Sequence, residues 1–347
     1  MGFQHGIAVA DLRPLIEQAI APHFQSLEGR PGVDRLFDEL HAVLRQIAGS
    51  TLEMIRGQAE GLGMEFTMLL KYACSFYLET RTKPTRAPRK TDEECTTWAA
   101  SNGATLDRAP ILVKNRDTYI ERIPLQVVAT TEPEDGYRYL CSTNAGSPGV
   151  PSSGMNETGL CVADTRDGYV DYGPGLPYQS LMMHVLEKHD TVRSALEFLK
   201  RAARVGGNNL ILADARGDLA VFEAGHTRYG IVEANDQLLV NANHPASAEM
   251  RAYTSGVATA ALTNSQRRYE ATQKELRAQR GQIDVDRVKR MMASHEERMG
   301  PLCRHDVPGG IGSKVATISC AIYLPRDRTL IISEGSPCQG KFQTYAL

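Results

Sequence analysis

Residues 93–117, EECTTWAASNGATLDRAPILVKNRD, span a change in the character of the chain. Immediately upstream, residues 81–94 (RTKPTRAPRKTDEE) hold five cations, three acids and two prolines with almost no apolar side chain. Such a segment cannot contribute to a core, so it is predicted to be an exposed linker. Downstream of Cys95, short apolar runs separated by turn residues are typical of β-strands. The sequence therefore predicts a boundary at Cys95, between residues 1–94 and 95–347.

The segment before the linker is predicted to be helical. From Asp34 to Ile55, apolar residues recur three and four positions apart, which is the spacing of one helix face. A glycine-containing break at 59–64 separates this run from a second one at 66–79, and no strand-like alternation occurs before Thr80.

Beyond Cys95, the sequence predicts strands and helices in alternating blocks. Strands are expected at 109–117, 125–132, 136–143, 158–164 and 237–245, hairpins at 209–225 and 315–335, and helices at 178–205 and 264–299. Helices between blocks of hairpin-linked strands indicate an α+β fold, in which mainly antiparallel sheets are covered by helices.

The composition argues against several classes of partner. The chain has 347 residues, with 39 Lys and Arg against 41 Asp and Glu, so no overall field attracts nucleic acid or an anionic membrane. No run approaches the roughly 18 apolar residues of a membrane span, and the N-terminus lacks the apolar run of a signal peptide. We therefore expect a soluble, cytoplasmic protein without a nucleic-acid or membrane partner.

Metal and cofactor motifs are also missing from the sequence. The seven cysteines are widely spaced and form no CxxC pair, which favours reduced thiols over a disulfide framework or a zinc ribbon. His184 and His189 are five apart, a poor spacing for a metal pair on a helix, and GGIGSK at 309–314 lacks the Gly-Lys-Ser/Thr order of a phosphate loop. We expect no metal site and no cofactor.

Cys95 is unusual because the fourteen residues before it are built to be exposed. The sequence elements that accompany it, in order, are EMIRGQAEGLGM (53–64), CTT (95–97), NRD (115–117), GMNETGLCVADT (154–165), NLILADARGDLAVFE (209–223), NANHP (241–245), SQRRY (265–269) and the ending EGSPCQGKFQTYAL. With these elements the chain resembles the cysteine N-terminal-nucleophile (Ntn) hydrolases of the acyl-CoA:6-aminopenicillanate (isopenicillin N) acyltransferase family. Bile salt hydrolase and penicillin V acylase are more distant relatives.

The resemblance implies a four-layer αββα sandwich over 95–347, preceded by a helical segment over 1–94. It also implies self-processing, in which the Cys95 thiol attacks the carbonyl of Glu94 and hydrolysis leaves Cys95 as a new N-terminus. The product is a heterodimer of an α fragment (1–94) and a β fragment (95–347). A free α-amine has a pKa of about 7.7 to 8.0, so it can accept the thiol proton at neutral pH without a separate histidine.

Three further residues are implied by the family motifs. Asp117 would orient the amine and stabilise its protonated form. Asn243 would donate its amide to the oxyanion of the tetrahedral intermediate, with Asn241 as the competing choice. Arg268 would hold the surroundings of the nucleophile by charge-assisted hydrogen bonds, and Arg267 is its neighbouring rival.

Asn115 is a weaker support candidate, and two positions depart from the family pattern. Glu94 stands where the family commonly has Gly before the nucleophile, so self-cleavage is expected to be slower or to depend on local strain. Thr165 stands where many relatives have an Asn of the oxyanion site, which leaves a backbone amide or the Thr165 hydroxyl as second donor. Lys114 replaces an Arg of bile salt hydrolases, which argues against transferring their substrate to this chain.

The sequence thus predicts an amidohydrolase that cleaves a C–N bond of a small N-acyl compound through an acyl-Cys95 thioester. The first alternative is an N-acyltransferase that moves an acyl group, for example from acyl-CoA, to a small amine. Further alternatives are an unprocessed relative that binds ligand without turnover, and an ordinary Cys-His enzyme with His244 or His226 as base. In the leading interpretation His244 is a structural neighbour. Whether the heterodimer assembles further is left open.

Overall fold

The computed structural model describes residues 1–82, 95–167, 170–253, 259–296, 298, 300–305, 307–308 and 314–347. Glu94, most of the predicted linker and the glycine-rich segment 309–313 lie outside these residues. The first two residues assigned to the linker, 81 and 82, form the end of a helix instead.

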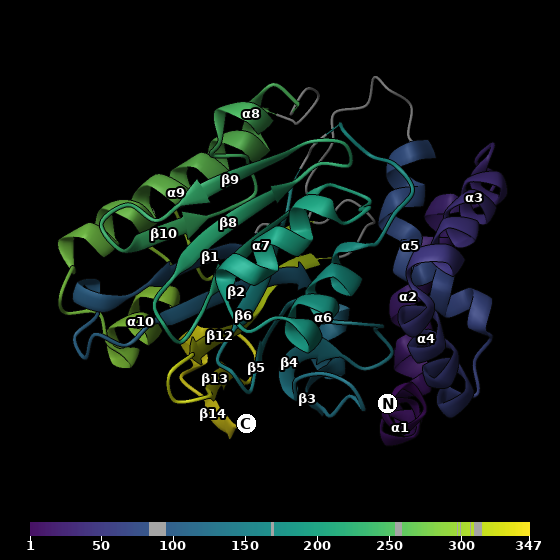
Figure 1. Ribbon diagram of the computed structural model, residues 1–347, viewed down its shortest axis with the longest axis horizontal. Coiled ribbons are helices and arrows are strands. Elements are labelled where there is room, and N and C mark those ends of the chain that lie inside the picture. Colours follow the sequence, from purple (N-terminus) through teal and green to yellow (C-terminus); the bar gives the residue numbers. More distant parts are fainter. Residues whose placement is uncertain are drawn as a thin grey trace.

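The N-terminal part is helical, as predicted, and forms a separate body at one side of the molecule (Figure 1). Its elements are α1 (Gly2–Ala8), η1 (Ala10–Leu12), α2 (Arg13–Leu27), α3 (Val33–Ile47), α4 (Gly49–Leu62) and α5 (Phe66–Thr82). The predicted run from 34 to 55 is divided at Ala48, and α4 ends at Gly63 with a φ of 63°, a conformation that favours glycine. The buried side chains of this body include Leu40, Leu69 and Leu78.

Two antiparallel sheets, each of seven strands within the described residues, form the centre of the second part. The first sheet has the order β10 (Leu238–Asn241), β1 (Thr96–Ala100), β2 (Ile111–Tyr119), β12 (Lys314–Leu324), β13 (Thr329–Ser333) and β14 (Phe342–Ala346), and β11 (Val307–Pro308) pairs with β12. The second has the order β3 (Gln126–Thr131), β4 (Tyr139–Asn144), β5 (Ser153–Asn156), β6 (Cys161–Arg166), β7 (Asn208–Ala213), β8 (Leu219–Ala224) and β9 (Tyr229–Glu233).

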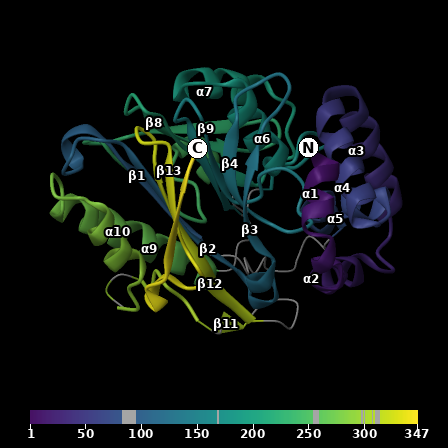
Figure 2. The same cartoon turned by 90° about the horizontal axis from the view of Figure 1, so that it is seen from below.

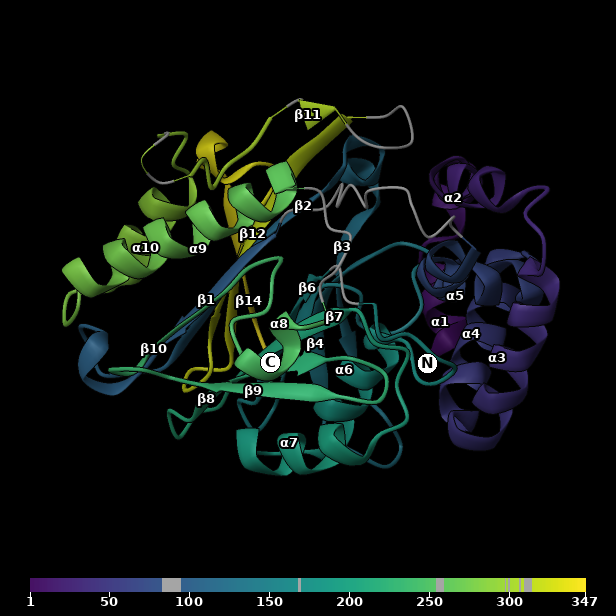
Figure 3. The same cartoon turned by 90° about the horizontal axis from the view of Figure 1, so that it is seen from above.

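Helices cover the outer face of each sheet (Figure 2). The first sheet is covered by α9 (Thr259–Ala278) and α10 (Val285–Met292), and the second by α6 (Tyr178–Lys188) and α7 (Val192–Arg201). Successive residues of a strand point to opposite faces. Accordingly, Trp98 of β1 packs against the α9 and α10 layer, while Ala99 is buried between the two sheets. This arrangement confirms the predicted αββα sandwich, with the N-terminal helices beside it (Figure 3).

Several details of the sandwich differ from the sequence prediction, which did not include strands β1, β9 and β14. The helix predicted at 178–205 is two helices, because Thr191 and Ser194 form a capping box that starts α7. The helix predicted at 264–299 is also two, since Gly281 adopts a φ of 79° and Asp284 caps α10. The four-residue strand β5, SGMN, was not predicted because glycine and asparagine are poor strand formers.

Both predicted hairpins are confirmed, as β7 with β8 and β12 with β13. The remaining short elements are η2 (Asn102–Ala104), η3 (Ile120–Leu125), α8 (Ala248–Arg251) and η5 (Pro337–Gln339). Among the residues described, no helix has the length and apolar character needed to cross a lipid bilayer.

Candidate active site

Cys95 immediately precedes β1 and is buried, with 5% of its surface exposed. Strand β1 lies between β10 and β2, so Thr96 pairs with Asn115 and Thr97 pairs with Asn241. The Cys95 thiol lies 3.8 Å from the backbone oxygen of Asp117. Strand pairing therefore brings together the sequence motifs at 95–97, 115–117 and 241–245.

Arg268 of α9 connects these strands by side-chain hydrogen bonds. Its guanidinium is fully buried and donates from Nη1 to Cys95 O at 2.8 Å and to Thr96 Oγ1 at 2.7 Å. Nη2 donates to Asn243 Oδ1 at 2.9 Å, and Nε donates to Asn264 Oδ1 at 2.7 Å. A buried charge is stable only when it is hydrogen-bonded in this way. Arg267 is exposed, so the geometry favours Arg268 as the predicted arginine.

Hydrogen bonds hold both the side chain and the backbone of Asn243 in place. Its Oδ1 accepts from Arg268, its Nδ2 donates to Arg166 O at 2.8 Å, and its backbone N–H donates to Ser265 Oγ at 2.8 Å. An amide nitrogen carries two hydrogens, and among the described residues the second of Asn243 has no assigned acceptor. Asn241 differs, because its Nδ2 donates both to Thr97 Oγ1 and to Thr165 Oγ1. The geometry therefore favours Asn243 over Asn241.

Asp117 is buried on β2, where β12 has an irregular register. Its Oδ1 accepts a hydrogen bond of 2.7 Å from Thr317 Oγ1 of β12. Asn115, two residues earlier, donates from Nδ2 to Met292 O at 2.8 Å and to Leu302 O at 2.7 Å. Asn115 thus braces the strand against the helical layer, which fits a supporting role.

A match to a protein-family model identifies the family of this chain. The model for acyl-coenzyme A:6-aminopenicillanic acid acyl-transferase matches residues 103–339, more than half of the chain. The chain belongs to this family. The matched range contains Asp117, Asn243 and Arg268 and begins shortly after Cys95.

Solved structures of a conjugated bile acid hydrolase share the fold of this acyltransferase family member. Two variants of the conjugated bile acid hydrolase from Clostridium perfringens align with TM-scores of 0.55 and 13% identity, covering 72% and 73% of this chain and 92% of theirs. An N-acylethanolamine-hydrolyzing acid amidase ortholog from Caenorhabditis elegans aligns at 0.49 and 15%, covering 67% of this chain and 93% of that one. Penicillin V acylase from Agrobacterium tumefaciens aligns at 0.47 and 18%, covering 69% and 82%. No curated protein sequence gives a significant match.

Thr165, the position that departs from the family pattern, is engaged elsewhere. Its hydroxyl donates to Ala242 O at 2.7 Å and accepts from Asn241 Nδ2 at 2.9 Å. The single hydroxyl hydrogen is therefore used to connect β6 with the exit of β10. This leaves a backbone amide as the better supported second donor for an oxyanion.

Lys114, the position compared with bile salt hydrolases, forms a buried connection between the sheets. Its Nζ donates to Ser152 O at 3.1 Å, to Asp164 O at 2.8 Å and to Asp164 Oδ1 at 2.5 Å. The Asp164 carboxylate thus balances the positive charge of Lys114 within the core, and these contacts join the two sheets.

Within the part of the chain that the structure describes, neither histidine considered as a base is hydrogen-bonded directly to Cys95. His244 Nδ1 lies 2.7 Å from Ser265 Oγ, and burial, with the nearby charges of Arg268 and Arg251, lowers the pKa of His244 to about 4. His226 Nδ1 lies 2.7 Å from Arg204 O. The contact and lowered pKa of His244 support its structural interpretation.

The sequence analysis missed two residues that support the site. Ser265 lies inside the quoted SQRRY motif and contacts both Asn243 and His244, but no role was assigned to it. Thr317 contacts Asp117 from 200 residues away, and no local signal marks it. Both supply hydroxyl groups that fix the orientation of a predicted residue.

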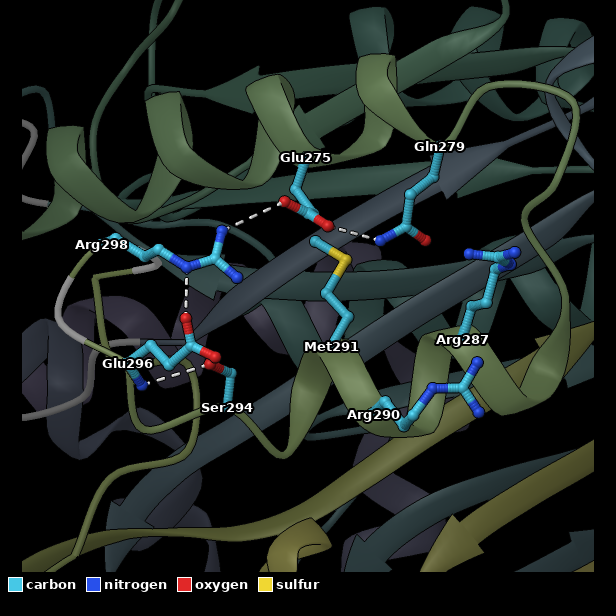
Figure 4. Close-up of a pocket in the computed structure, with 8 residues that line it drawn as sticks. All are labelled: Glu275, Gln279, Arg287, Arg290, Met291, Ser294, Glu296 and Arg298. Carbon is cyan, nitrogen blue, oxygen red and sulfur yellow. Dashed lines mark hydrogen bonds and ion pairs between the residues drawn. The ribbon is translucent and has the colours of Figure 1, made fainter.

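Two hollows differ in their relation to the site. One lies where the N-terminal helices meet the sandwich, and its lining includes Phe76, Arg116, Asn144 and Arg166. Its lining residue Arg116 directly follows Asn115, the strand partner of Thr96, but none of the predicted catalytic residues lines this hollow. The other lies between α9 and α10 (Figure 4), is lined by charged side chains such as Glu275 and Arg298, and includes none of the predicted site residues.

Proposed function

We propose that this protein is a self-processing Ntn amidohydrolase that cleaves the C–N amide bond of a small N-acyl compound through an acyl-Cys95 thioester. The observation that carries this proposal is the set of hydrogen bonds from Arg268 to the Cys95 carbonyl, to Thr96 and to Asn243. One buried cation thereby fixes the backbone of the nucleophile and the side chain of the oxyanion donor together. Membership of an acyl-transferring family supports the same class of reaction.

Maturation begins at the bond between Glu94 and Cys95. The Cys95 sulfur attacks the carbonyl carbon of Glu94, the amide C–N bond breaks, and a thioester forms while the nitrogen takes up a proton. Water then cleaves the thioester, which gives a Glu94 carboxylate, a free thiol and a free α-amine. The α fragment (1–94) and the β fragment (95–347) remain associated, because buried residues of the helical body pack with Leu125, Ala145 and Val205 of the sandwich.

The new α-amine acts as the base in turnover. It takes the proton of the Cys95 thiol, the thiolate attacks the substrate carbonyl, and the same proton passes to the leaving amine. Asn243 Nδ2 stabilises the oxyanion, and Asp117 orients the protonated amine. Water hydrolyses the resulting acyl-thioester and restores the enzyme. A reduced Cys95 is required throughout, which agrees with the predicted cytoplasmic location.

The hollow lined by Phe76 and Arg116 supports a small acyl compound as substrate. Phe76 and Tyr72 of α5 and Tyr178 of α6 provide aromatic walls, while Arg116 and Arg166 provide positive charge. The Arg166 guanidinium lies 4.5 Å from the centre of the Phe76 ring. The α fragment would thus line the substrate pocket, and an aromatic or anionic acyl group fits this lining.

Transfer to an amine is the second candidate function, because the matching family is named for acyl transfer. Water and an amine compete for the same thioester, and the outcome depends on which of them the closed pocket holds in line. The deciding experiment assays matured enzyme on a panel of N-acyl amides, with and without acyl-CoA and a free amine. We expect hydrolysis without CoA and only partial diversion of acyl groups to the amine. Product formation that strictly requires both acyl-CoA and amine would replace the hydrolase proposal by the transferase.

A further inference from the structure

Four potential metal ligands come together near the end of α10, far from Cys95 in the sequence. They are His295, which follows α10, Cys303 and His305, which precede β11, and Cys338 in η5. One nitrogen or sulfur atom from each lies within 4.8 Å of the corresponding atoms of the other three. Cys303 is buried, whereas the other three residues are exposed.

The distances within this group match a tetrahedral ion site. With Zn–S near 2.3 Å and Zn–N near 2.0–2.1 Å, tetrahedral geometry separates neighbouring ligand atoms by roughly 3.3–3.8 Å. His305 Nε2 lies 3.1 Å from His295 Nε2, 3.6 Å from Cys303 Sγ and 3.3 Å from Cys338 Sγ. Three of the six edges of the tetrahedron, those from His305, therefore lie close to the required lengths, and the other three ligand pairs lie within 4.8 Å.

Hydrogen bonding alone does not account for this convergence. His305 Nε2 carries at most one hydrogen, yet it has three close neighbours. Two of these neighbours are thiol sulfurs, which are weak hydrogen-bond partners. A cation at the centre would satisfy all four atoms at once.

The backbone holds the contributing segments in place. The N–H groups of Leu302 and Cys303 both donate to Ser294 O, at 3.1 and 3.0 Å, which fixes Cys303 beside His295. Ser336 Oγ donates to Thr317 O at 2.7 Å, which fixes η5 against β12. These hydrogen bonds therefore position Cys303 and the segment that carries Cys338.

We propose that His295, Cys303, His305 and Cys338 form a structural zinc site. Two thiolates and two imidazoles in a tetrahedron are a ligand set typical of zinc, and four protein ligands leave no open position for a substrate. Zinc binding at this site can be measured without the proposed reaction at Cys95. It departs from the expectation of no metal, because its ligands come from separate segments and not from a CxxC pair.

The zinc site would stabilise the chain segment that contacts Asn115 and Thr317, and through Thr317 it would stabilise Asp117. The segment that carries Cys303 and His305 also contains Leu302, whose carbonyl accepts from Asn115 Nδ2 at 2.7 Å. Arg304 N–H donates to Thr317 Oγ1 at 2.8 Å, and Thr317 Oγ1 in turn donates to Asp117 Oδ1. Fixing this segment with an ion therefore fixes the orientation of Asp117.

The test measures the metal directly in the full-length protein purified without chelator and under reducing conditions. Elemental analysis should find about one zinc per chain, and exchange with Co²⁺ should give the visible bands of tetrahedral cobalt with thiolate ligands. Cys303→Ala and the double variant Cys303→Ala/Cys338→Ala should lose both signals. Cys74→Ala, which removes a buried cysteine of α5 outside the group, should keep both and serves as the matched control.

His295→Ala is included in case the Cys303 variants fail to fold. It removes a single ligand whose side chain is exposed, so the fold should tolerate the change. In competition with a chelator, its zinc affinity should fall by more than the roughly 10–100-fold typical of losing an outer-shell partner. The proposal is overturned if the wild-type protein binds no zinc after Zn²⁺ is added, or if the ligand variants bind it as tightly as wild type. A disulfide between Cys303 and Cys338 in zinc-free native protein, detected by non-reducing peptide mapping, would also overturn it.

Discussion

The guanidinium of Arg268 donates a 2.8 Å hydrogen bond to the carbonyl oxygen of Cys95, although 173 residues separate the two. The same guanidinium holds Asn243 Oδ1. A helix of the outer layer thus controls the position of the predicted nucleophile and of the predicted oxyanion donor. This relationship makes Arg268 the natural place to test how the site is assembled.

Arg268→Ala should slow maturation and turnover by at least about tenfold, which corresponds to roughly 1.4 kcal/mol of lost transition-state stabilisation. The reason is that Cys95 O, Thr96 Oγ1 and Asn243 Oδ1 all lose their donor. Time courses of fragment formation and kcat/KM measure the effect. Arg267→Ala is the matched control, since Arg267 is exposed and should behave as wild type. Equal losses in both variants would contradict this assignment.

Asn243→Ala should lower kcat by about 10²–10³ with a much smaller change in KM, because an oxyanion donor acts mainly in the transition state. Asn241→Ala should instead lower the melting temperature, since Asn241 connects Thr97 and Thr165. Steady-state kinetics and thermal unfolding of both variants separate the two roles. A larger kcat loss in correctly folded Asn241→Ala would reverse the choice between them.

Thr317→Val should reduce turnover by about tenfold, because it removes a hydroxyl that holds Asp117 Oδ1 while keeping the side-chain volume. Thr317→Ser retains the hydroxyl and should recover near wild-type kcat. A comparison of pH–rate profiles adds a second measure. If Asp117 no longer orients the α-amine, the apparent pKa assigned to this amine in the profile should shift. If Thr317→Ser is as impaired as Thr317→Val, the hydroxyl contact is not what matters.

His244 should make the fold sensitive to mild acid. Burial lowers its pKa to about 4 in the folded protein from an ordinary value of 6.5, so the unfolded chain binds the proton more readily. Its contribution to the free energy of unfolding is complete above about pH 6.5 and declines as the pH falls toward 4, by at most about 1.4 kcal/mol per pH unit. Urea unfolding of wild type and His244→Gln at pH 7 and pH 5 should show a smaller acid loss in the variant.

The same variant separates the leading mechanism from a Cys-His one. His244→Gln should still mature, because the α-amine of Cys95 is the proposed base. Folded His244→Gln that neither matures nor turns over would favour histidine as base.

Family motifs in the sequence nominated the residues of the candidate site. Cys95, Asp117, Asn243 and Arg268 each lie in a motif, and the pairing of β1 with β2 and β10 brings three of these motifs together. Thr317 was not predictable, because its contact with Asp117 depends on the irregular register between β2 and β12. Such a register is set by the assembled sheet and leaves no periodic signal in either strand.

The fold was predictable to a similar extent. Alternation and turn residues identified both hairpins, whereas periodicity alone joined α6 to α7 and α9 to α10. The breaks between these helices depend on helix caps, such as the capping box of Thr191 and Ser194. Such a cap forms only when the preceding chain leaves the helix axis. The group formed by His295, Cys303, His305 and Cys338 was hidden for the same reason, since three separate segments must first come together.

The central claim is that Cys95 becomes a new N-terminus, and intact-mass spectrometry of folded recombinant protein after prolonged incubation tests it most directly. The proposed mechanism predicts two associated fragments, residues 1–94 and 95–347, in place of the 38.1 kDa chain. Cys95→Ala should remain a single chain under the same conditions, which excludes cleavage by a contaminating protease. One persistent 38.1 kDa species in folded wild-type protein would contradict self-processing.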